Sequence, residues 1–331
     1  MLGWLALAAL PALGWFGQRT SESRDRKRFC MPGRLIEVNG ESIHVVVEGA
    51  GPVVMFDSGL GGSSLEWGAV ASDLRRDFTV VRYDRPGFGW SPSSAREPSL
   101  TGAAERIRGI VASLDIDGPV ILVGHSLGGL HVRAVAALSP DLVGGLVLVD
   151  PSHENMLDDA DTARNAARMT RVMSAMAATA PLGTPRVIGR LYSRMVAGQV
   201  RGAIDATGRE SLECSTRLTA CSVAGMRTSV REMTAIPQTL SEMKDLARKH
   251  PSATIPVTVI SAAAEPRTAS ERAGREKIRT LHESQVQGTS LGRLVLAANS
   301  GHLVPLDEPE LIAACVREIA ATTAQPVRPA P

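Results

Sequence analysis

The segment around Ser126 constrains the fold more than any other part of this chain. An apolar run at residues 120–123 leads into Gly-His-Ser-Leu-Gly-Gly at residues 124–129, and a stretch of helical character follows at once, up to Leu138. In a Gly-x-Ser-x-Gly turn the chain passes so sharply from strand to helix that the serine takes a strained backbone conformation, and the glycines let strand and helix approach. The segment therefore predicts an outward-pointing serine hydroxyl in a fold where strands and helices alternate.

Short apolar runs alternate with segments of helical length on both sides of that turn. Residues 34–38 and 42–48 are joined through Asn39-Gly40, which is the strongest short signal for a β-hairpin. The apolar runs that follow suit parallel strands covered on both faces, and they lie at residues 52–56, 78–83, 120–123 and 145–149. Helical segments are expected at residues 67–74, 101–114 and 130–138. This alternation predicts an α/β fold with a doubly wound, mostly parallel sheet.

The alternation stops at Pro151 and resumes only near Ile255, so the chain must carry an insertion. Residues 152–250 have helical character and hold eight of the eleven methionines. We interpret them as a helical cap whose methionines either fill a small core or line an adaptable apolar surface. The predicted core comprises residues 31–151 and 251–323, with final strands at 255–261 and 293–297 and a closing helix at 310–320. Residues 324–331 are expected to be a flexible tail.

The first thirty residues form a segment apart from the predicted core. Residues 2–17 are apolar and uncharged, and basic residues follow them at Arg19, Arg24, Arg26, Lys27 and Arg28. Sixteen residues fall short of the roughly 20 that span a bilayer, and the basic start of a signal peptide is missing. We interpret residues 1–30 as an apolar leader or membrane anchor with a basic flank, which predicts a membrane-anchored protein. A cleaved signal, giving a secreted protein, and a plain leader, giving a cytoplasmic one, are the alternatives.

Charge and cysteine content exclude some classes of function. The 36 basic and 34 acidic residues leave a formal charge of +2, which argues against a nucleic-acid partner. The four cysteines include no Cys-x-x-Cys pair, so no structural metal site is expected. Cys214 and Cys221 are too far apart for a disulfide if one unbroken helix holds both, and the sequence leaves their state open.

A serine hydroxyl becomes a nucleophile only with a base to take its proton, and a third group must orient that base. His302 is the expected base, because it lies in the loop between the last predicted strand and the final helix; His125 and His44 are less well placed. Asp150 ends the strand that follows the Ser126 turn, and it is the favoured acid. Glu265, after the next strand, is the alternative acid, since the carboxyl ends of parallel strands share one edge.

An acyl-transfer site also needs two N–H groups that hold the negative oxygen of the tetrahedral intermediate. The amide of Leu127, directly after the serine, is expected to be one of them. Residues 58–62, Ser-Gly-Leu-Gly-Gly, follow a predicted strand, and their glycines let the backbone turn inward. We expect the Leu60 amide to be the second donor, although these glycines could be turn residues only.

These segments, in this order, resemble the α/β-hydrolase superfamily from about residue 32 to residue 320. The resemblance includes Asp84 to Ser91, similar to a family segment that supports the loops around the site. Haloalkane dehalogenases are similar in outline and place their acid after the strand that follows the turn, which favours Asp150. Their nucleophile is an aspartate, as it is in epoxide hydrolases, so Ser126 argues against both activities. The Ser-Ala-Ala-Ala-Glu run at residues 261–265 lacks the usual glycine and aspartate and leaves the acid open.

The sequence thus predicts a serine hydrolase that cleaves a small-molecule carboxylic ester or related acyl substrate through an acyl-enzyme on Ser126. No metal or organic cofactor is implied. The cap is expected to act as a lid whose apolar lining selects small to medium apolar groups. Cofactor-free haloperoxidase or perhydrolase activity and a non-catalytic binding role are alternatives. An aminopeptidase is another, with its substrate amine held by four acidic residues that also fit a solvated helix start: Glu154, Asp158, Asp159 and Asp161.

Overall fold

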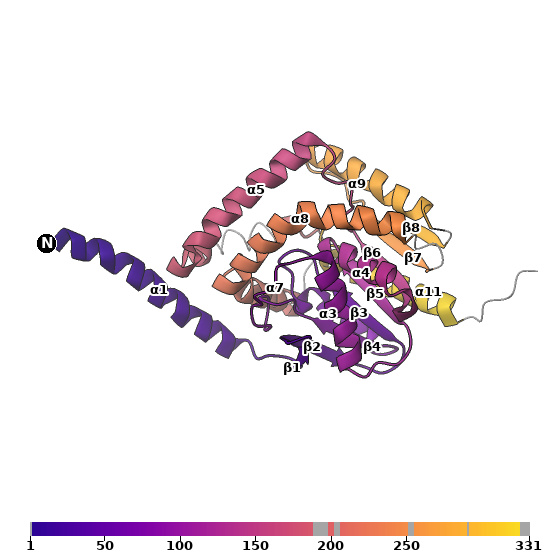
Figure 1. The fold of residues 1–331 in the computed structure, drawn as a ribbon, viewed down its shortest axis with the longest axis horizontal. Coiled ribbons are helices and arrows are strands. Elements are labelled where there is room, and N and C mark those ends of the chain that lie inside the picture. The colour runs from indigo at the N-terminus through magenta and orange to yellow at the C-terminus, as the bar shows by residue number, and fades with distance from the viewer. Residues whose placement is uncertain (1, 188–197, 202–205, 251–254, 290, 325–331) are drawn as a thin grey trace, which may run out of the picture.

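A computed structural model describes residues 2–187, 198–201, 206–250, 255–289 and 291–324. Within these residues, eight strands form one sheet in the order β1-β2-β4-β3-β5-β6-β7-β8 (Figure 1). The strands are β1 (Arg34–Val38), β2 (Glu41–Glu48), β3 (Val53–Asp57), β4 (Thr79–Tyr83), β5 (Val120–His125), β6 (Val143–Val149), β7 (Val257–Ala262) and β8 (Gly292–Ala297).

Strand pairing confirms the doubly wound, mostly parallel sheet. β1 and β2 form the expected antiparallel hairpin, with positive φ values of 52° at Asn39 and 79° at Gly40. These values suit the two-residue turn that matches the twist of a hairpin. β2 also pairs antiparallel with β4, and every later pair in the order is parallel. The carboxyl ends of β3 to β8 therefore lie along one edge of the sheet.

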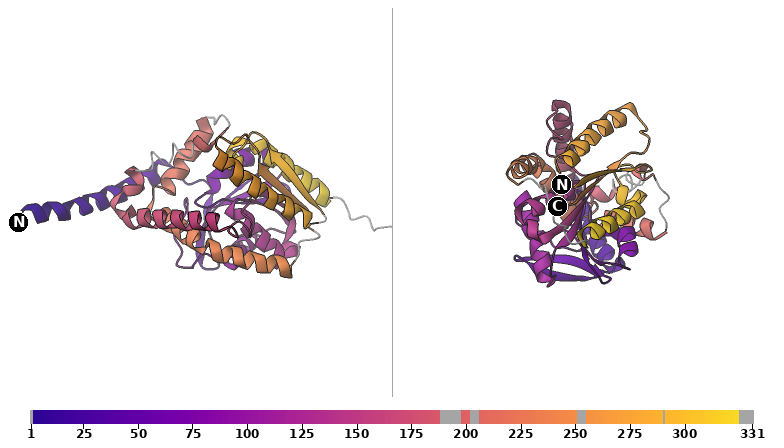
Figure 2. Two further views of the ribbon diagram at one scale, coloured as in Figure 1. Left: turned by 90° about the horizontal axis from the view of Figure 1, so that it is seen from above. Right: turned by 90° about the vertical axis from the view of Figure 1, so that its right-hand side faces the viewer.

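Helices cover both faces of the sheet (Figure 2). α2 (Gly68–Leu74) and α11 (Pro309–Ala324) pack on one face, and α3 (Leu100–Ser113) and α4 (Leu127–Leu138) on the other. α9 (Ala269–Gln287) packs against β7 and β8. The short segments η1 (Ser64–Trp67), η2 (Pro140–Leu142) and α10 (Val304–Asp307) complete the core. Each face buries its own apolar cluster, so the sheet gives the strand ends a rigid support.

The described part of the insertion between β6 and β7 is mostly helical, as expected. It contains α5 (Ala160–Thr179), η3 (Ala180–Leu182), α7 (Ala206–Leu218) and α8 (Val223–Lys249). Met226 is buried among these helices with Met173 and Met176 packed against it, which fits the interpretation of methionines as fillers of a small core. The boundary expected at residue 251 and nearly all of the predicted tail lie outside the described residues.

α1 (Leu2–Arg28) is one continuous helix whose second half packs on the insertion. The Gln18 side chain is buried and donates to the Cys221 carbonyl at 2.9 Å, and Asp25 pairs with Arg186 at 2.7 Å. The first half extends away from the body (Figures 1 and 2). No helix in the described ranges is long and apolar enough to cross a membrane. The anchor at residues 2–17 stays a prediction.

The cysteines carry free thiols, which answers the question that their spacing left open. Cys214 lies in α7, but the helix ends at Leu218, before Cys221. Burial raises the pKa of the Cys214 thiol to about 12, so this thiol stays protonated and unreactive near neutral pH.

Candidate active site

Ser126 occupies the sharp turn between β5 and α4 that its sequence predicts. Its φ of 51° is positive, and its N–H donates to the Val149 carbonyl at 3.1 Å, which ties the turn to β6. A Cβ atom at Gly124 would lie 2.4 Å from the Gly128 carbonyl oxygen, and one at Gly128 would lie 2.3 Å from the Asp57 carbonyl oxygen. Both positions therefore exclude any side chain, and this close backbone approach explains the two glycines of the motif.

His302, in the loop after β8, lies directly against Ser126. Its Nε2 is 3.1 Å from Ser126 Oγ, and its Nδ1 is 2.6 Å from Asp150 Oδ2. The His302 side chain is 51% exposed, whereas His44, His125, His131, His153 and His282 are buried. Among these histidines, His302 alone combines solvent access with a hydroxyl partner at Nε2.

Asp150 directly follows β6, and its backbone is strained, with a φ of 39°. Its Oδ1 accepts the Ala262 N–H at 3.0 Å while Oδ2 meets His302. Burial acts to raise the pKa of this carboxyl, but the hydrogen bond and charge of His302 outweigh burial and lower it. Asp150 is therefore an anion at neutral pH. The alternative acid, Glu265, is 83% exposed and pairs with Arg272 at 3.1 Å, so the geometry favours Asp150.

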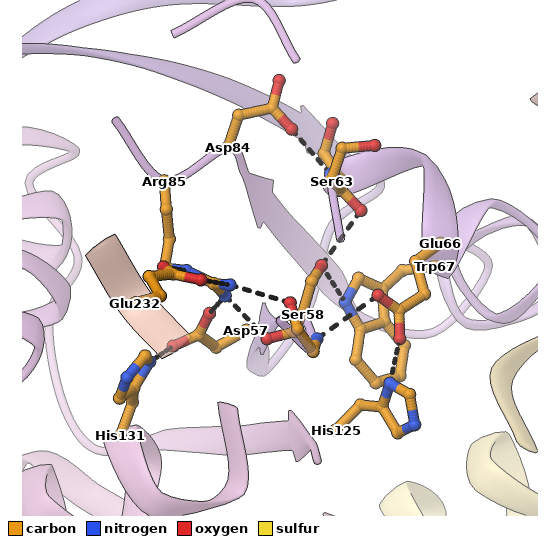
Figure 3. A network of polar contacts seen from close by, with 12 residues as sticks. Asp57, Ser58, Ser63, Glu66, Trp67, Asp84, Arg85, His125, His131 and Glu232 are labelled. Carbon is orange, nitrogen blue, oxygen red and sulfur yellow. Dashed lines mark hydrogen bonds and ion pairs between the residues drawn. The ribbon is translucent and has the colours of Figure 1, made fainter. Parts of the chain in front are cut away.

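The loop at residues 58–62 lies beside Ser126 and is held from behind by Arg85 (Figure 3). Arg85 Nη1 donates to the Ser58 carbonyl at 2.6 Å, and Nη2 donates to the Gly59 carbonyl at 2.7 Å. A trans peptide unit points its C=O and N–H in opposite directions. The Leu60 N–H, which shares a peptide unit with the Gly59 carbonyl, therefore points away from Arg85. The Leu127 N–H begins α4 and lies in the helix turn whose N–H groups lack intrahelical acceptors.

Arg85 also joins the core to the insertion through buried ion pairs. Its Nη1 donates to Asp57 at 2.8 Å, and its Nε and Nη2 donate to the two carboxylate oxygens of Glu232, on α8, at 2.7 and 3.1 Å (Figure 3). Asp57 also accepts from His131 at 2.7 Å. Burial acts to raise the pKa of Asp57, but His131 and Arg85 lower it strongly, so these buried charges stabilise one another.

Asp84, one residue before Arg85, supports the same loop region. Its Oδ1 accepts the Ser64 N–H at 2.6 Å. Its Oδ2 accepts the Trp90 N–H at 3.0 Å and lies 2.8 Å from His44 Nδ1. This arrangement agrees with the supporting role that the resemblance implies for residues 84–91.

A second histidine–carboxylate pair, His125 with Glu66, lies under the site (Figure 3). Nδ1 of His125 contacts the Glu66 carboxylate, and Nε2 is 2.8 Å from the His302 carbonyl oxygen. The other Glu66 oxygen accepts the Gly59 N–H at 3.4 Å. Burial acts to lower the pKa of His125, but Glu66 outweighs it and raises this pKa. The pair links the loop of His302, the turn at Ser126 and the loop at residues 58–62.

A hollow of about 340 Å³ opens above Ser126 and His302, and α7 forms part of its wall. Its lining includes five leucines: Leu60, Leu65, Leu212, Leu303 and Leu306. Four hydroxyl side chains also line it: Ser211, Ser215, Thr216 and Thr219. The expected apolar lining is thus a mixed one, with no methionine among the described lining residues.

The acidic residues considered for amine binding all have cationic partners. Glu154 pairs with Arg133 at 2.6 Å, Asp158 with Lys244 at 2.5 Å and Asp159 with Lys277 at 3.1 Å, and Asp161 pairs with Arg164. None of the four lines the hollow above Ser126 as the structure describes it. Their placement does not favour an aminopeptidase.

The sequence reasoning missed two residues of this site and placed a third only in outline. Glu66 and Glu232 belong to no motif, and each acts through a partner distant in sequence. Arg85 lies within the segment of family resemblance, and its position beside Asp84 was the available signal.

Comparison with known proteins places this arrangement in a family. The family model described as the alpha/beta hydrolase family matches residues 53–315, which is more than half of the chain. The chain belongs to the alpha/beta hydrolase family. This membership agrees with the resemblance that the sequence motifs indicate, and it supports a hydrolase.

Curated relatives of this alpha/beta hydrolase match only part of its length. A 2-(acetamidomethylene)succinate hydrolase of Mesorhizobium japonicum is 32% identical over 117 residues, 35% of this chain and 42% of that protein. An uncharacterised protein of Mycobacterium tuberculosis is 36% identical over 103 residues, 31% of this chain and 30% of that protein. The chain thus spans less than half the length of these relatives.

Solved structures share the fold over most of this hydrolase. A thermophilic esterase from Thermogutta terrifontis, solved with malate bound, aligns with a TM-score of 0.65 at 20% identity, covering 88% of this chain and 100% of that one. An enol-lactonase from Burkholderia xenovorans aligns with a TM-score of 0.61 at 19% identity, covering 87% and 99%. At these identities the likeness shows the fold alone.

Proposed function

We propose that this protein is a serine hydrolase that cleaves a carboxylic ester or related acyl substrate through an acyl-enzyme on Ser126. One observation carries the proposal: Asp150, His302 and Ser126 form a continuous chain of contacts of 2.6 and 3.1 Å. Membership of the alpha/beta hydrolase family supports the hydrolytic class.

In the first half of the reaction, Ser126 Oγ attacks the substrate carbonyl while His302 Nε2 takes its proton. The Asp150 carboxylate holds His302 with the proton on Nδ1 and stabilises the imidazolium that forms. His302 then gives its proton to the leaving group. Because Asp150 is anchored through Oδ1 to Ala262, the imidazole is oriented before substrate arrives.

The tetrahedral intermediate carries an oxyanion, which we assign to the amides of Leu60 and Leu127. The position of Arg85 behind residues 58–59 supports this assignment, since it directs the Leu60 N–H to the opposite side. In the second half, His302 activates a water molecule that attacks the acyl-enzyme, and the same two amides hold the second intermediate.

We further propose that residues 152–250 form a cap over a core made of residues 31–151 and 251–323. The contribution of α7 to the hollow above Ser126 supports a cap that contacts the substrate. Because leucines and hydroxyls share the lining, we expect substrates whose arms carry both apolar and polar atoms.

The test uses the full chain, a fluorescent phosphonate and p-nitrophenyl acetate, with the variants Ser126→Ala and Ser152→Ala. The phosphonate should label the wild type and Ser152→Ala but not Ser126→Ala, and ester turnover should follow the labelling. A folded wild-type protein that neither reacts with the phosphonate nor turns over the ester would exclude a serine hydrolase and favour a binding role for this hollow.

A further inference from the structure

A second hollow, of about 410 Å³, lies on the far side of His302. The carboxyl end of β7, the start of α9 and residues 198–201 line it, together with Asp150 and His302. It shares Gln199 and His302 with the hollow above Ser126, so the two hollows meet at the base. We call this second hollow the arginine hollow, because Arg201, Arg267 and Arg275 line it.

The arginine hollow holds more positive than negative charge. Its described lining has three guanidinium groups against the carboxylates of Glu271 and Asp150, and Asp150 is already bonded to His302. The single Glu271 Oε1 accepts from Arg201 Nη2 and from Arg275 Nη2, each at 2.5 Å. One carboxylate neutralises one guanidinium, so the cluster keeps an excess of cationic N–H donors.

One of these donors is buried without an acceptor. Arg201 Nε has no hydrogen-bond partner in the described structure, although the side chain is only 15% exposed. A Cβ built on Gly301 would lie 3.6 Å from this Nε and 3.7 Å from Arg275 Nη2. Both atoms are therefore close to the residue that precedes the base. A buried donor without an acceptor is unfavourable, and an anion bound in the hollow would stabilise the charge of this guanidinium.

The remaining contacts hold the arginines in place. Arg267 Nη1 donates to the Gly198 carbonyl at 2.5 Å, and its backbone N–H donates to Glu271 at 2.7 Å. The backbone N–H of Arg201 donates to Asp307 at 2.6 Å, and its Nη1 to the Glu265 carbonyl at 3.4 Å. Arg275 Nη1 contacts the Ala264 carbonyl. Ordered guanidinium groups bind a planar carboxylate at a lower entropic cost than free ones.

We propose that the arginine hollow binds a carboxylate on the alcohol arm of the substrate, so that the enzyme prefers esters whose leaving group is an anion. This inference rests on the proposed serine hydrolase function. His302 gives its proton to the leaving oxygen, so the alcohol arm lies on the His302 side of the scissile bond. The arginine hollow meets the hollow above Ser126 at His302 and Gln199, so a substrate arm that extends past His302 reaches it.

The test compares the release of acetate from 3- and 4-acetoxybenzoate with that from their methyl esters, which carry a neutral methoxycarbonyl group in place of the carboxylate. The wild type should hydrolyse at least one acetoxybenzoate with a kcat/KM roughly tenfold or more above that of its methyl ester, as expected for one charge-assisted contact. Arg201→Gln and Arg275→Gln should each bring this ratio close to one. Arg272→Gln, an exposed arginine outside the hollow, should keep the wild-type ratio.

Two results would overturn the inference. One is a wild type whose kcat/KM for the methyl esters equals or exceeds its kcat/KM for both acetoxybenzoates. The other is a pair of arginine variants that slow charged and neutral esters alike, which would mean that the arginines only hold residues 198–201 against α9.

A binding measurement separates this inference from the proposed function. Calorimetry with Ser126→Ala and each of the two acetoxybenzoates should show, for at least one of them, binding that Arg275→Gln weakens roughly tenfold or more. If the wild type turns over no ester but this binding is seen, the serine hydrolase proposal fails and the anion site stands. If neutral esters are turned over and no binding is seen, the anion site fails alone.

Discussion

Two histidine–carboxylate pairs, His302 with Asp150 and His125 with Glu66, lie side by side at the hollow above Ser126. They differ in the group that Nε2 of the histidine contacts. The rings of His302 and His125 have centroids 4.8 Å apart, and each Nδ1 faces a carboxylate. Nε2 of His302 faces the Ser126 hydroxyl, whereas Nε2 of His125 faces a backbone carbonyl. A hydroxyl can give up its proton, and a carbonyl has none to give.

The difference shows that a nearby carboxylate does not by itself make a histidine a base. Because the carbonyl oxygen of His302 only accepts, Nε2 of His125 must carry a proton, and the Glu66 carboxylate favours a second proton at Nδ1. The Glu66 carboxylate thus favours the cationic form of His125, and Nε2 of His125 holds the loop of His302. In the proposed mechanism His302, which is half exposed, takes and releases protons during turnover.

The largest expected effect follows from removing either end of the reactive pair. Ser126→Ala and His302→Ala should each lower kcat for p-nitrophenyl acetate by roughly 10⁶-fold, because nucleophile and base act as a unit. The double variant should be no slower than either single variant. Additive losses in the double variant would contradict a shared step.

Replacing the carboxylate of each histidine–carboxylate pair by an amide should lower kcat/KM to very different extents. Asp150→Asn should lower kcat/KM by roughly 10⁴-fold, since the amide favours the wrong tautomer of His302. The matched control, Glu265→Gln, removes the alternative acid and should leave kcat/KM within about twofold, because exposed ion pairs contribute little. A larger loss in Glu265→Gln than in Asp150→Asn would reassign the acid.

Glu66→Gln, the corresponding change in the second pair, should lower kcat/KM by only about tenfold. The amide no longer favours the cationic His125, and the loops at His302 and Gly59 shift from their reactive geometry. The loss should appear mainly in kcat. A loss as large as that of Asp150→Asn would mean that His125, and not only His302, moves protons during the reaction.

The smallest effect concerns stability as a function of pH. The pKa of His125 is raised above the usual 6.5 in the folded chain. The contribution of the His125–Glu66 pair to the free energy of unfolding is therefore fully present below about pH 6.5, and it is lost as pH rises through the pKa of His125 in the folded chain. Urea unfolding of Ser126→Ala between pH 6 and pH 9 should show this decline. The free energy of unfolding should fall less steeply with pH in a Ser126→Ala, Glu66→Gln double variant. Equal slopes in the two variants would contradict a Glu66 carboxylate that favours the cationic form of His125.

Local patterns explain which parts of this fold could be predicted. The hairpin at Asn39-Gly40 and the turn at Ser126 depend on neighbouring residues, so their sequences specify them. Asp150 and His302 could be predicted to lie together because strand alternation places both at one edge of the sheet. α9 escaped prediction because its surface is largely polar, with His282 as its buried residue, and it shows little apolar periodicity.

Long-range polar contacts account for most of what the sequence could not show. Glu232 meets Arg85 across 147 positions of the chain. In the sequence, a glutamate of an amphipathic helix that will be buried against the core looks the same as one that faces solvent. The same holds for Glu66, whose partner His125 is far along the chain and marked only by its place beside Ser126.

The contact of Glu232 with Arg85 has a mechanical consequence for the insertion. Moving α8 away from the core would break both contacts between Glu232 and the buried Arg85 guanidinium, which opposes such an opening. α7 meets the core through an apolar cluster in which Cys214 and Leu218 are buried with Trp90, and through a 3.1 Å contact between the hydroxyls of Ser63 and Ser215. The insertion is thus held to the core by buried charges along α8 and by apolar and hydroxyl contacts along α7. Because α7 also lines the hollow above Ser126, substitutions in its contacts with the core should alter the rates of substrate entry and product release.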